Sequence, residues 1–309
     1  DSDGGNEAAE EAPRRIRQEA MTSSVVNPVE TIKPAEVTDK VQAPAAPPEE
    51  PAPAPPVLDE SKFSSLTAII DNPALFTERL ERFTRLYQHL SDKEVAQADD
   101  ARRGGDPEKA KALMEKARTH IFMAYHAYEM GMSKYPENVP ILNGMGELLY
   151  DRFGEETEAV TLWEKAAKVD PKYSKSFNNL GIHYCHIGEY ERGIQNLDKA
   201  LALDPNHPDY LYNMAQMYLT HWPQMMRIRT WSMEKLYTEA MALSKRAAEN
   251  APDDAQLARD YAMNFFMADT MGAVPDWKSA AKAWQALRKA VKKDDEIFNA
   301  WLNEGRVYL

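Results

Sequence analysis

The stretch FNNLGIHY at residues 177–184 decides the fold, because its aromatic, small and large apolar residues recur at three- and four-residue steps. Such steps bring side chains to one face of an α-helix. After a short break, a second pattern of this kind runs through Gly193, Leu197 and Ala200. Pro205 then ends it, because proline cannot continue a helix. The stretch therefore predicts two consecutive helices, with small residues where the helices approach each other.

The same unit recurs along the chain. Pro171 precedes Pro205 by 34 residues, and Pro136 precedes Pro171 by 35, which indicates one extra residue in the first helix of that earlier unit. Pro252 follows Pro205 by 47 residues, so this unit holds 13 residues more than one repeat. A degenerate unit and a last helix follow, marked by Tyr261-Ala262, Phe265, Ala280, Trp284, Leu287, Trp301, Gly305 and Tyr308.

These residues resemble the pattern of the tetratricopeptide repeat proteins, in which aromatic, Leu-Gly, Tyr, small, large apolar, Ala and Pro positions recur every 34 residues. The resemblance covers residues 136–309. It implies an all-α solenoid of helix-turn-helix units, wound into a right-handed superhelix whose inner groove is lined by the first helix of each unit. It also implies a non-catalytic scaffold or adaptor that binds a protein or an extended peptide, with no cofactor.

The composition divides the chain into three parts. Residues 1–62 form an acidic, Pro/Ala-rich segment: residues 1–60 contain no aromatic residue and half of the 20 prolines, so we expect a disordered tail with an extended spacer at residues 43–56. Residues 63–135 show helical periodicity, with one long helix starting near Pro73 and a second starting near Pro107, and we expect atypical repeats here. Residues 136–309 form the repeat array.

The charge distribution excludes nucleic acid as the main ligand. Residues 1–60 carry 13 acidic against 5 basic side chains, and the rest of the chain carries 36 against 32, whereas phosphate-binding domains have a dense basic stripe. No apolar run approaches the ~20 residues of a membrane span. The start at Asp1 favours an exported or membrane-tethered location over a cytoplasmic one, with any tether in a segment before Asp1.

Asparagines are the candidate peptide ligands. Asn179, Asn213 and Asn303 each lie directly before the Leu-Gly, Met-Ala or Glu-Gly pair of their unit, so the resemblance places them in a row along the groove. An amide can donate to and accept from a peptide backbone at once. Asp260 interrupts the row. The candidate groove residues are Asn143, Asn179, His186, Asn213 and Asn303; these positions lack the cations of a carboxylate clamp.

The 13 extra residues fall around residues 220–235 and combine Trp, Met and Arg, the composition of a buried interface centre. The alternative is that these side chains lengthen two helices and pack on each other. The candidates for a partner interface are Trp222, Met225, Met226, Arg227, Arg229 and Trp231.

Other chemistry finds little support in the sequence. His183, Cys185 and His186 stand without a second ligand cluster, so we predict no metal site. No phosphate loop, nucleophile elbow or zinc-protease motif occurs, and the sequence predicts no enzyme. Two alternatives to the adaptor remain: a structural subunit built into a larger, membrane-associated complex, and the substrate-recognition arm of an enzyme located in another chain or domain.

Overall fold

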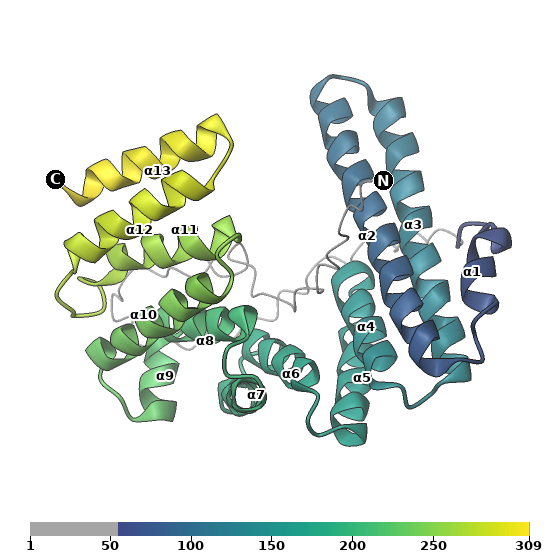
Figure 1. The fold of residues 1–309 in the computed structure, drawn as a ribbon, viewed down its shortest axis with the longest axis horizontal. Coiled ribbons are helices and arrows are strands. Elements are labelled where there is room, and N and C mark those ends of the chain that lie inside the picture. The colour runs from purple at the N-terminus through teal and green to yellow at the C-terminus, as the bar shows by residue number, and fades with distance from the viewer. Residues whose placement is uncertain (1–54, 309) are drawn as a thin grey trace, which may run out of the picture. The chain divides into compact units, whose positions relative to one another are not determined.

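The computed structural model describes residues 55–308, and every regular element in this range is a helix (Figure 1). The predicted disordered tail falls mostly on residues 1–54, outside the described residues. Helical structure begins at Glu60, where the Asp59 side chain accepts a hydrogen bond from the Ser61 N–H at 3.1 Å. The described chain divides into two compact units, with the boundary in the sequence between Ala127 and Tyr128.

The unit of residues 55–127 is a helical hairpin preceded by two short helices. It comprises η3 (Glu60–Phe63), α1 (Ser64–Thr67), α2 (Pro73–Arg103) and most of α3 (Pro107–Lys134). The α2 helix starts at Pro73 because the Asn72 side chain caps it, accepting from the Leu75 N–H at 3.2 Å. Gly105, with φ 79°, turns the chain towards α3 in the left-handed region that favours glycine. The predicted starts of both long helices are confirmed.

The unit of residues 128–308 is an array of paired helices. Each pair joins a first helix to a second helix, and a single helix follows the last pair. The pairs are α4 (Val139–Leu148) with α5 (Glu156–Val169), α6 (Ser174–His186) with α7 (Tyr190–Leu203), α8 (Pro208–Thr220) with α10 (Met233–Asn250), and α11 (Ala255–Asn264) with α12 (Trp277–Ala290), followed by α13 (Asp294–Val307).

Two departures from the regular repeat are absorbed locally. The extra residue predicted in the first unit becomes the π-helical turn η4 (Leu149–Phe153) at the end of α4, because one inserted residue widens a single helical turn. The 13 extra residues become mainly the additional helix α9 (Trp222–Arg229) between α8 and α10. A short 3₁₀ helix, η5 (Phe265–Met267), ends α11.

Glycine sets the distance between paired helices. A Cβ added at Gly181 of α6 would lie 2.7 Å from Leu197 Cγ of α7, and one added at Gly146 of α4 would lie 2.5 Å from Trp163 Nε1 of α5. Leu197 and Trp163 are both fully buried. Gly146 and Gly181 therefore serve as the close-approach points of the first two pairs.

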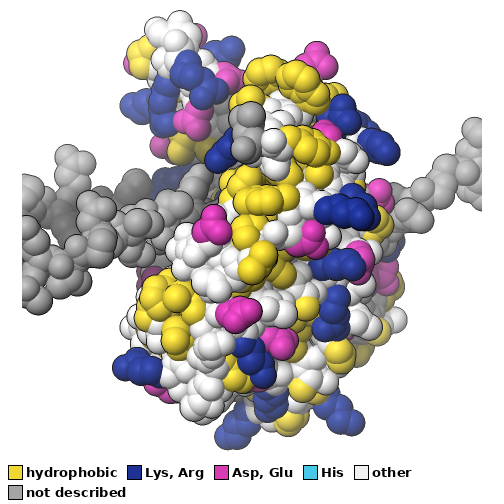
Figure 2. Space-filling view, turned by 90° about the vertical axis from the view of Figure 1, so that its left-hand side faces the viewer, with side chains coloured by type: hydrophobic (Ala, Val, Ile, Leu, Met, Phe, Trp, Pro, Cys, Tyr) yellow, Lys and Arg dark blue, Asp and Glu magenta, His cyan; other side chains and the backbone are white. Residues whose placement is uncertain are grey.

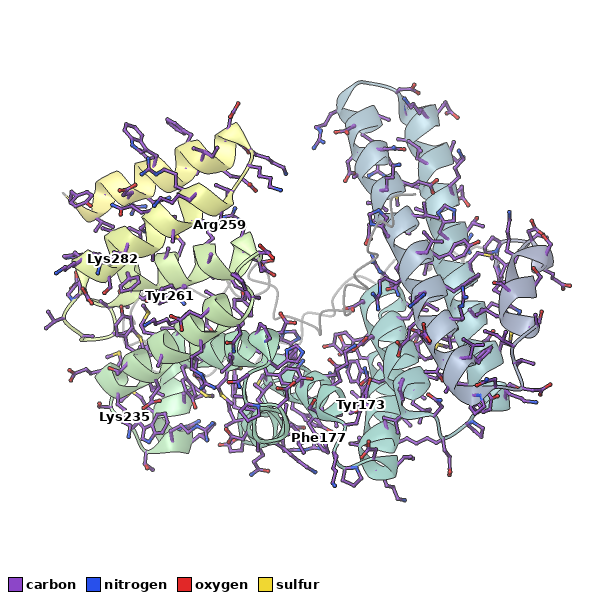
Figure 3. All side chains as sticks on the ribbon, viewed as in Figure 1. Tyr173, Phe177, Lys235, Arg259, Tyr261 and Lys282 are labelled. Atoms are coloured by element: carbon purple, nitrogen blue, oxygen red, sulfur yellow. The ribbon has the colours of Figure 1, made fainter. Side chains whose placement is uncertain are left out.

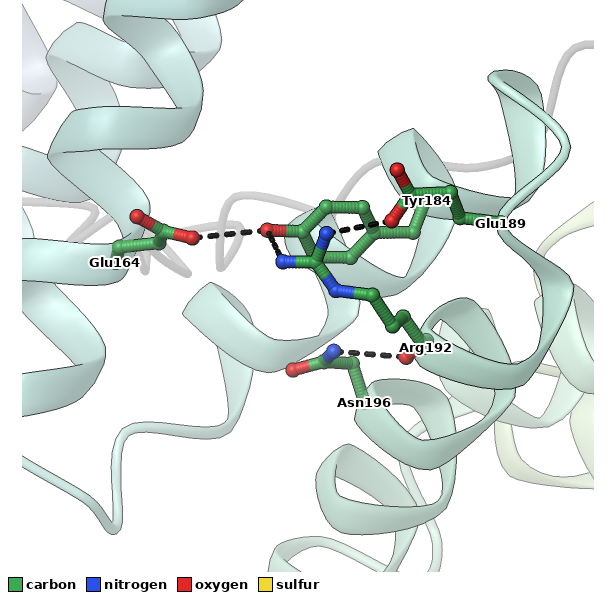
Figure 4. A network of polar contacts seen from close by, with 5 residues as sticks. All are labelled: Glu164, Tyr184, Glu189, Arg192 and Asn196. Carbon is green, nitrogen blue, oxygen red and sulfur yellow. Dashed lines mark hydrogen bonds and ion pairs between the residues drawn. The ribbon is translucent and has the colours of Figure 1, made fainter.

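A polar network around Tyr184 joins neighbouring units (Figure 4). Tyr184 of α6 donates to Glu164 Oε1 of α5 at 2.9 Å, and its hydroxyl accepts from Arg192 of α7 at 2.7 Å. The Arg192 guanidinium also lies 3.8 Å from the centre of the Tyr184 ring. Burial, followed by the hydrogen bond to Glu164, raises the pKa of Tyr184 to about 12. One hydroxyl thus links three helices of two units.

The close approach at Gly181 predicts opposite effects for two matched substitutions. Gly181→Ala forces α6 and α7 apart and lowers the free energy of unfolding by about 1–3 kcal/mol. Gly305→Ala, on a helix surface where an added Cβ meets nothing within 4 Å, raises it by up to about 1 kcal/mol through helix propensity. Urea unfolding followed by circular dichroism measures both, and equal effects would contradict this role for Gly181.

The Tyr184 network predicts a pH-dependent contribution to stability. Because the pKa of Tyr184 is raised above its ordinary value of 10.0, its contribution is complete below about pH 10 and is lost as the pH approaches 12. Tyr184→Phe should cost about 1 kcal/mol at pH 8 and less at pH 11, as measured by urea unfolding. Tyr308→Phe, at a side chain that is 69% exposed, serves as the control and should change stability at neither pH.

Candidate functional site

The first helices of the array are α4, α6, α8, α11 and α13, and they carry the five predicted groove residues. Asn143 is on α4, Asn179 and His186 are on α6, Asn213 is on α8, and Asn303 is on α13. Asn143, Asn179 and Asn213 are at most 1% exposed, His186 is exposed, and Asn303 is partly buried.

The buried asparagines bond across neighbouring first helices. Asn179 Nδ2 donates to Asn143 Oδ1 at 3.3 Å and to Glu147 Oε1 at 2.9 Å, and Asn143 Nδ2 also reaches Glu147, at 2.8 Å. Further along, Asn213 Nδ2 donates to Asn178 Oδ1 at 2.9 Å. These amides therefore stabilise the stacking of α4, α6 and α8. The binding of a peptide by these asparagines stays a prediction. A bound peptide would have to compete with the hydrogen bonds that the asparagines make to one another and to Glu147.

His186 lies beside an aromatic cluster at the end of α6. Its Nδ1 is 3.4 Å from the Tyr150 hydroxyl, and Tyr150 packs edge-on against His183 at 5.7 Å between ring centres. Burial raises the pKa of the neighbouring Cys185 thiol to about 12, which disfavours the thiolate that binds metals. No group of three or more His, Cys, Asp or Glu side chains among the described residues is placed to hold a metal ion.

The inserted helix α9 is attached to the array by its own interface candidates. Arg229 makes two hydrogen bonds to the Asp198 carboxylate of α7, at 2.8 and 2.6 Å, and its guanidinium lies 5.8 Å from the Trp231 ring centre. Met225 is fully buried. Trp222, Met226 and Trp231 are partly buried. The expectation that they contact a partner stays a prediction. Arg227 is exposed and lines a shallow hollow with α7.

A second hollow, of about 330 Å³, lies between α11, α12 and α13, and we call it the α11–α13 hollow. Its floor includes the buried side chains of Trp284 and Leu287. Polar and apolar groups of the first helices complete the lining: Arg259, Met263, Glu296, Asn299, Ala300 and Asn303. Asn303 is thus a predicted groove residue that lines this hollow.

The α11–α13 hollow presents charges of both signs beside amide groups. Arg259, labelled in Figure 3, lies 3.4 Å from Glu296, and both side chains remain partly exposed, at 41% and 30%. Asn303 donates to the Asn299 carbonyl at 3.0 Å and accepts from Arg306 at 2.9 Å. One amide N–H and one lone pair of Asn303 therefore remain available to a ligand.

The floor of the hollow also carries an unsatisfied donor. Trp284 Nε1 is buried and has no hydrogen-bond partner among the described residues. Its counterpart in the first pair, Trp163, donates through Nε1 to the Asn143 carbonyl at 3.2 Å. The indole N–H of Trp284 thus lacks the hydrogen bond that the indole N–H of Trp163 makes.

Sequence reasoning missed Arg259, Met263 and Asn299. Arg259 directly precedes Asp260, where the asparagine row breaks, and Asn299 lies one helical turn before Asn303. Asn299 could have been found from the sequence, because it is four residues before Asn303 and residues four apart share a helix face.

No described helix is both long and apolar enough to cross a membrane.

Comparisons with known proteins agree with the repeat pattern. The family model described as "TPR repeat" matches residues 183–221. The chain is 37% identical over 68 residues to Photosystem I assembly protein Ycf3 of Synechococcus sp. (strain CC9605), covering 21% of this chain and 39% of that protein. It is 25% identical over 117 residues to small glutamine-rich tetratricopeptide repeat-containing protein 2 of Mycosarcoma maydis, covering 38% and 31%. The chain spans less than two-fifths of each relative.

Among solved structures, the crystal structure of MamA superposes with a TM-score of 0.40 at 18% identity, covering 62% of this chain and 93% of that chain. The repeat spacing, the paired helices and the family match lead to one conclusion: residues 183–221 match the tetratricopeptide repeat, and the helix pairs of residues 128–308 form a solenoid of the tetratricopeptide type.

Proposed function

We propose that the chain is a non-catalytic scaffold that holds an extended segment of a partner protein in the α11–α13 hollow. Tetratricopeptide repeats support protein–protein interaction, and the proposal assigns that role to a particular surface. The observation that carries it is the hollow itself, where side chains of two first helices converge over an apolar floor.

The lining determines the kind of segment that fits. An apolar side chain of the ligand would rest on Met263, which is 38% exposed, and on Leu287 beneath it. The free amide groups of Asn303 would bond the ligand backbone, which gives affinity without demanding a particular side chain. Arg259 and Glu296 line the hollow and would favour a ligand that carries both charges.

The region around α4, α6 and α8 has a different role in this proposal. Its asparagines are buried and bonded to their neighbours, so we assign them to the stability of the array. The inserted helix α9 is likewise held by Arg229 and Met225, which leaves fewer of its side chains for a permanent partner.

Peptide selection tests the hollow directly. A phage library of random linear peptides, selected on the intact chain, should yield binders that share an apolar residue. Met263→Asp should weaken the binding of these peptides at least about tenfold, as measured by fluorescence anisotropy. The reason is that the apolar residue of the bound peptide would remove water from the new carboxylate. Leu86→Asp, the same kind of change at an exposed position of α2, is the control. Equal affinity of the wild type and Met263→Asp would refute the proposed site.

A second prediction separates the buried asparagines from the ligand site. Asn179→Ala removes hydrogen bonds to Asn143 and Glu147, and should lower the free energy of unfolding by about 1–3 kcal/mol in urea. Binding of the selected peptides should stay unchanged. Unchanged stability with lost peptide binding would instead support the peptide-binding role of Asn179 that the sequence predicts.

A further inference from the structure

The second helix of the last pair, α12, carries three lysines on its solvent-exposed side, and we call them the lysine row. Lys278, Lys282 and Lys289 are exposed, and their spacing of four and seven residues places them on one face of the helix. Among the described residues, none of the three makes an ion pair. Lys282 is labelled in Figure 3, and Figure 2, viewed from the side of the C-terminal repeats, shows Lys and Arg side chains gathered along one edge of that surface.

The charges next to the lysine row leave it cationic. Arg288 of α12 is paired with Glu304 at 3.4 Å, so it does not belong to the row. Asp276, at the start of α12, accepts a hydrogen bond from the Ser279 N–H at 3.0 Å. Its pKa is lowered mainly by its hydrogen bonds to Ser279 and also by the first two lysines of the row. Residues 292–295, Lys-Lys-Asp-Asp, carry two charges of each sign and add no net charge.

The repeat does not require lysines at these positions. Each second helix has a buried small residue at the same place in the repeat: Ala159, Gly193, Ala240 or Ala280. Counted from it, the equivalents of the row are Thr157, Thr161 and Lys168 in α5, Glu191, Gln195 and Ala202 in α7, and Thr238, Ala242 and Glu249 in α10. Their net charges are +1, -1 and -1, against +3 in α12. All nine are exposed although further helices follow each of these pairs, so this face stays open inside the array.

The lysine row suits a ligand that offers carboxylates and no apolar side chain. The exposed Ala286 and the partly buried Gln285 fill the face between Lys282 and Lys289. The large apolar residues of α12, Trp284 and Leu287, are buried on its other side, in the floor of the α11–α13 hollow. A face of this kind attracts acidic segments through their charge.

Residues 1–12, which lie outside the described residues, have this composition. They contain five acidic side chains, no basic one and no aromatic residue. The remainder of residues 1–60 fits less well, because residues 13–48 carry four acidic against five basic side chains. Of the four acidic side chains in residues 49–60, Asp59 and Glu60 lie at the start of η3. The 42 residues from 13 to 54 can span up to about 140 Å, so the length of the chain permits residues 1–12 to reach the row.

We propose that residues 1–12 bind the lysine row of their own chain through ion pairs. Each exposed ion pair is weak, so the contact depends on several carboxylates acting together. It depends also on the covalent connection, which raises the local concentration of the segment to about the millimolar range. The bound segment leaves the α11–α13 hollow free, because that hollow lies on the other side of α12. An acidic segment of another protein would have to displace residues 1–12 to reach the row.

Carbodiimide cross-linking of the full chain in dilute solution, followed by mass spectrometry, tests this contact. The reagent joins carboxylates directly to amines, so it should link residues 1–12 to the lysine row within one chain. The yield should fall at least about fivefold between about 0.05 and about 0.5 M sodium chloride, because salt screens exposed charges. Lys109, Lys111 and Lys116, three exposed lysines of α3, are the control and should be linked at a lower yield.

A fluorescent label on residues 1–12 provides the second measurement. Ala9→Cys can be labelled selectively in the full chain, because Cys185 is 2% exposed. The anisotropy of the label should fall when all three lysines of the row are changed to Gln, and it should stay unchanged when the three control lysines are changed to Gln. Circular dichroism checks that both triple variants remain folded. The proposal is overturned if the cross-links reach the row and the control lysines equally, if they join two chains, or if the row variant keeps the anisotropy of the wild type.

Discussion

The contact between paired helices at Gly146 and Gly181 is the constraint on which the rest of the array depends. Without a Cβ at these positions, Trp163 and Leu197 of the second helices lie directly against the first helices. The spacing within each pair determines where the next first helix stacks. The buried amides of Asn143 and Asn179 then find each other across that stack.

Irregular segments are tolerated where they leave this contact intact. The π-helical turn Leu149–Phe153 follows the close-approach point of α4, and α9 lies between the two helices of its pair without separating α8 from α10. Arg229 holds α9 to the preceding pair through Asp198. The array can thus carry an insertion because each repeat is stabilised chiefly by its neighbours.

The pairs, the insertion and the last helix could be predicted from the sequence, because helical periodicity and proline spacing are local signals. The 35-residue interval from Pro136 to Pro171 even anticipated the extra residue that became a π-helical turn. The fate of the asparagines could not be predicted, because family geometry gives the face of Asn179 but not the presence of Glu147 and Asn143 within hydrogen-bonding distance. The α11–α13 hollow lies in the most degenerate repeat, where the pattern is weakest.

The central claim is that the array is internally bonded at α4, α6 and α8 and open to a ligand at α11 and α13. Hydrogen–deuterium exchange of the intact chain, with and without a selected peptide, tests it most directly. The account predicts that the peptide slows exchange in α11 around Arg259 and Met263 and in α13 around Asn299 and Asn303. Slowed exchange confined to α4, α6, α8 or α9, with α11 and α13 unchanged, would contradict it.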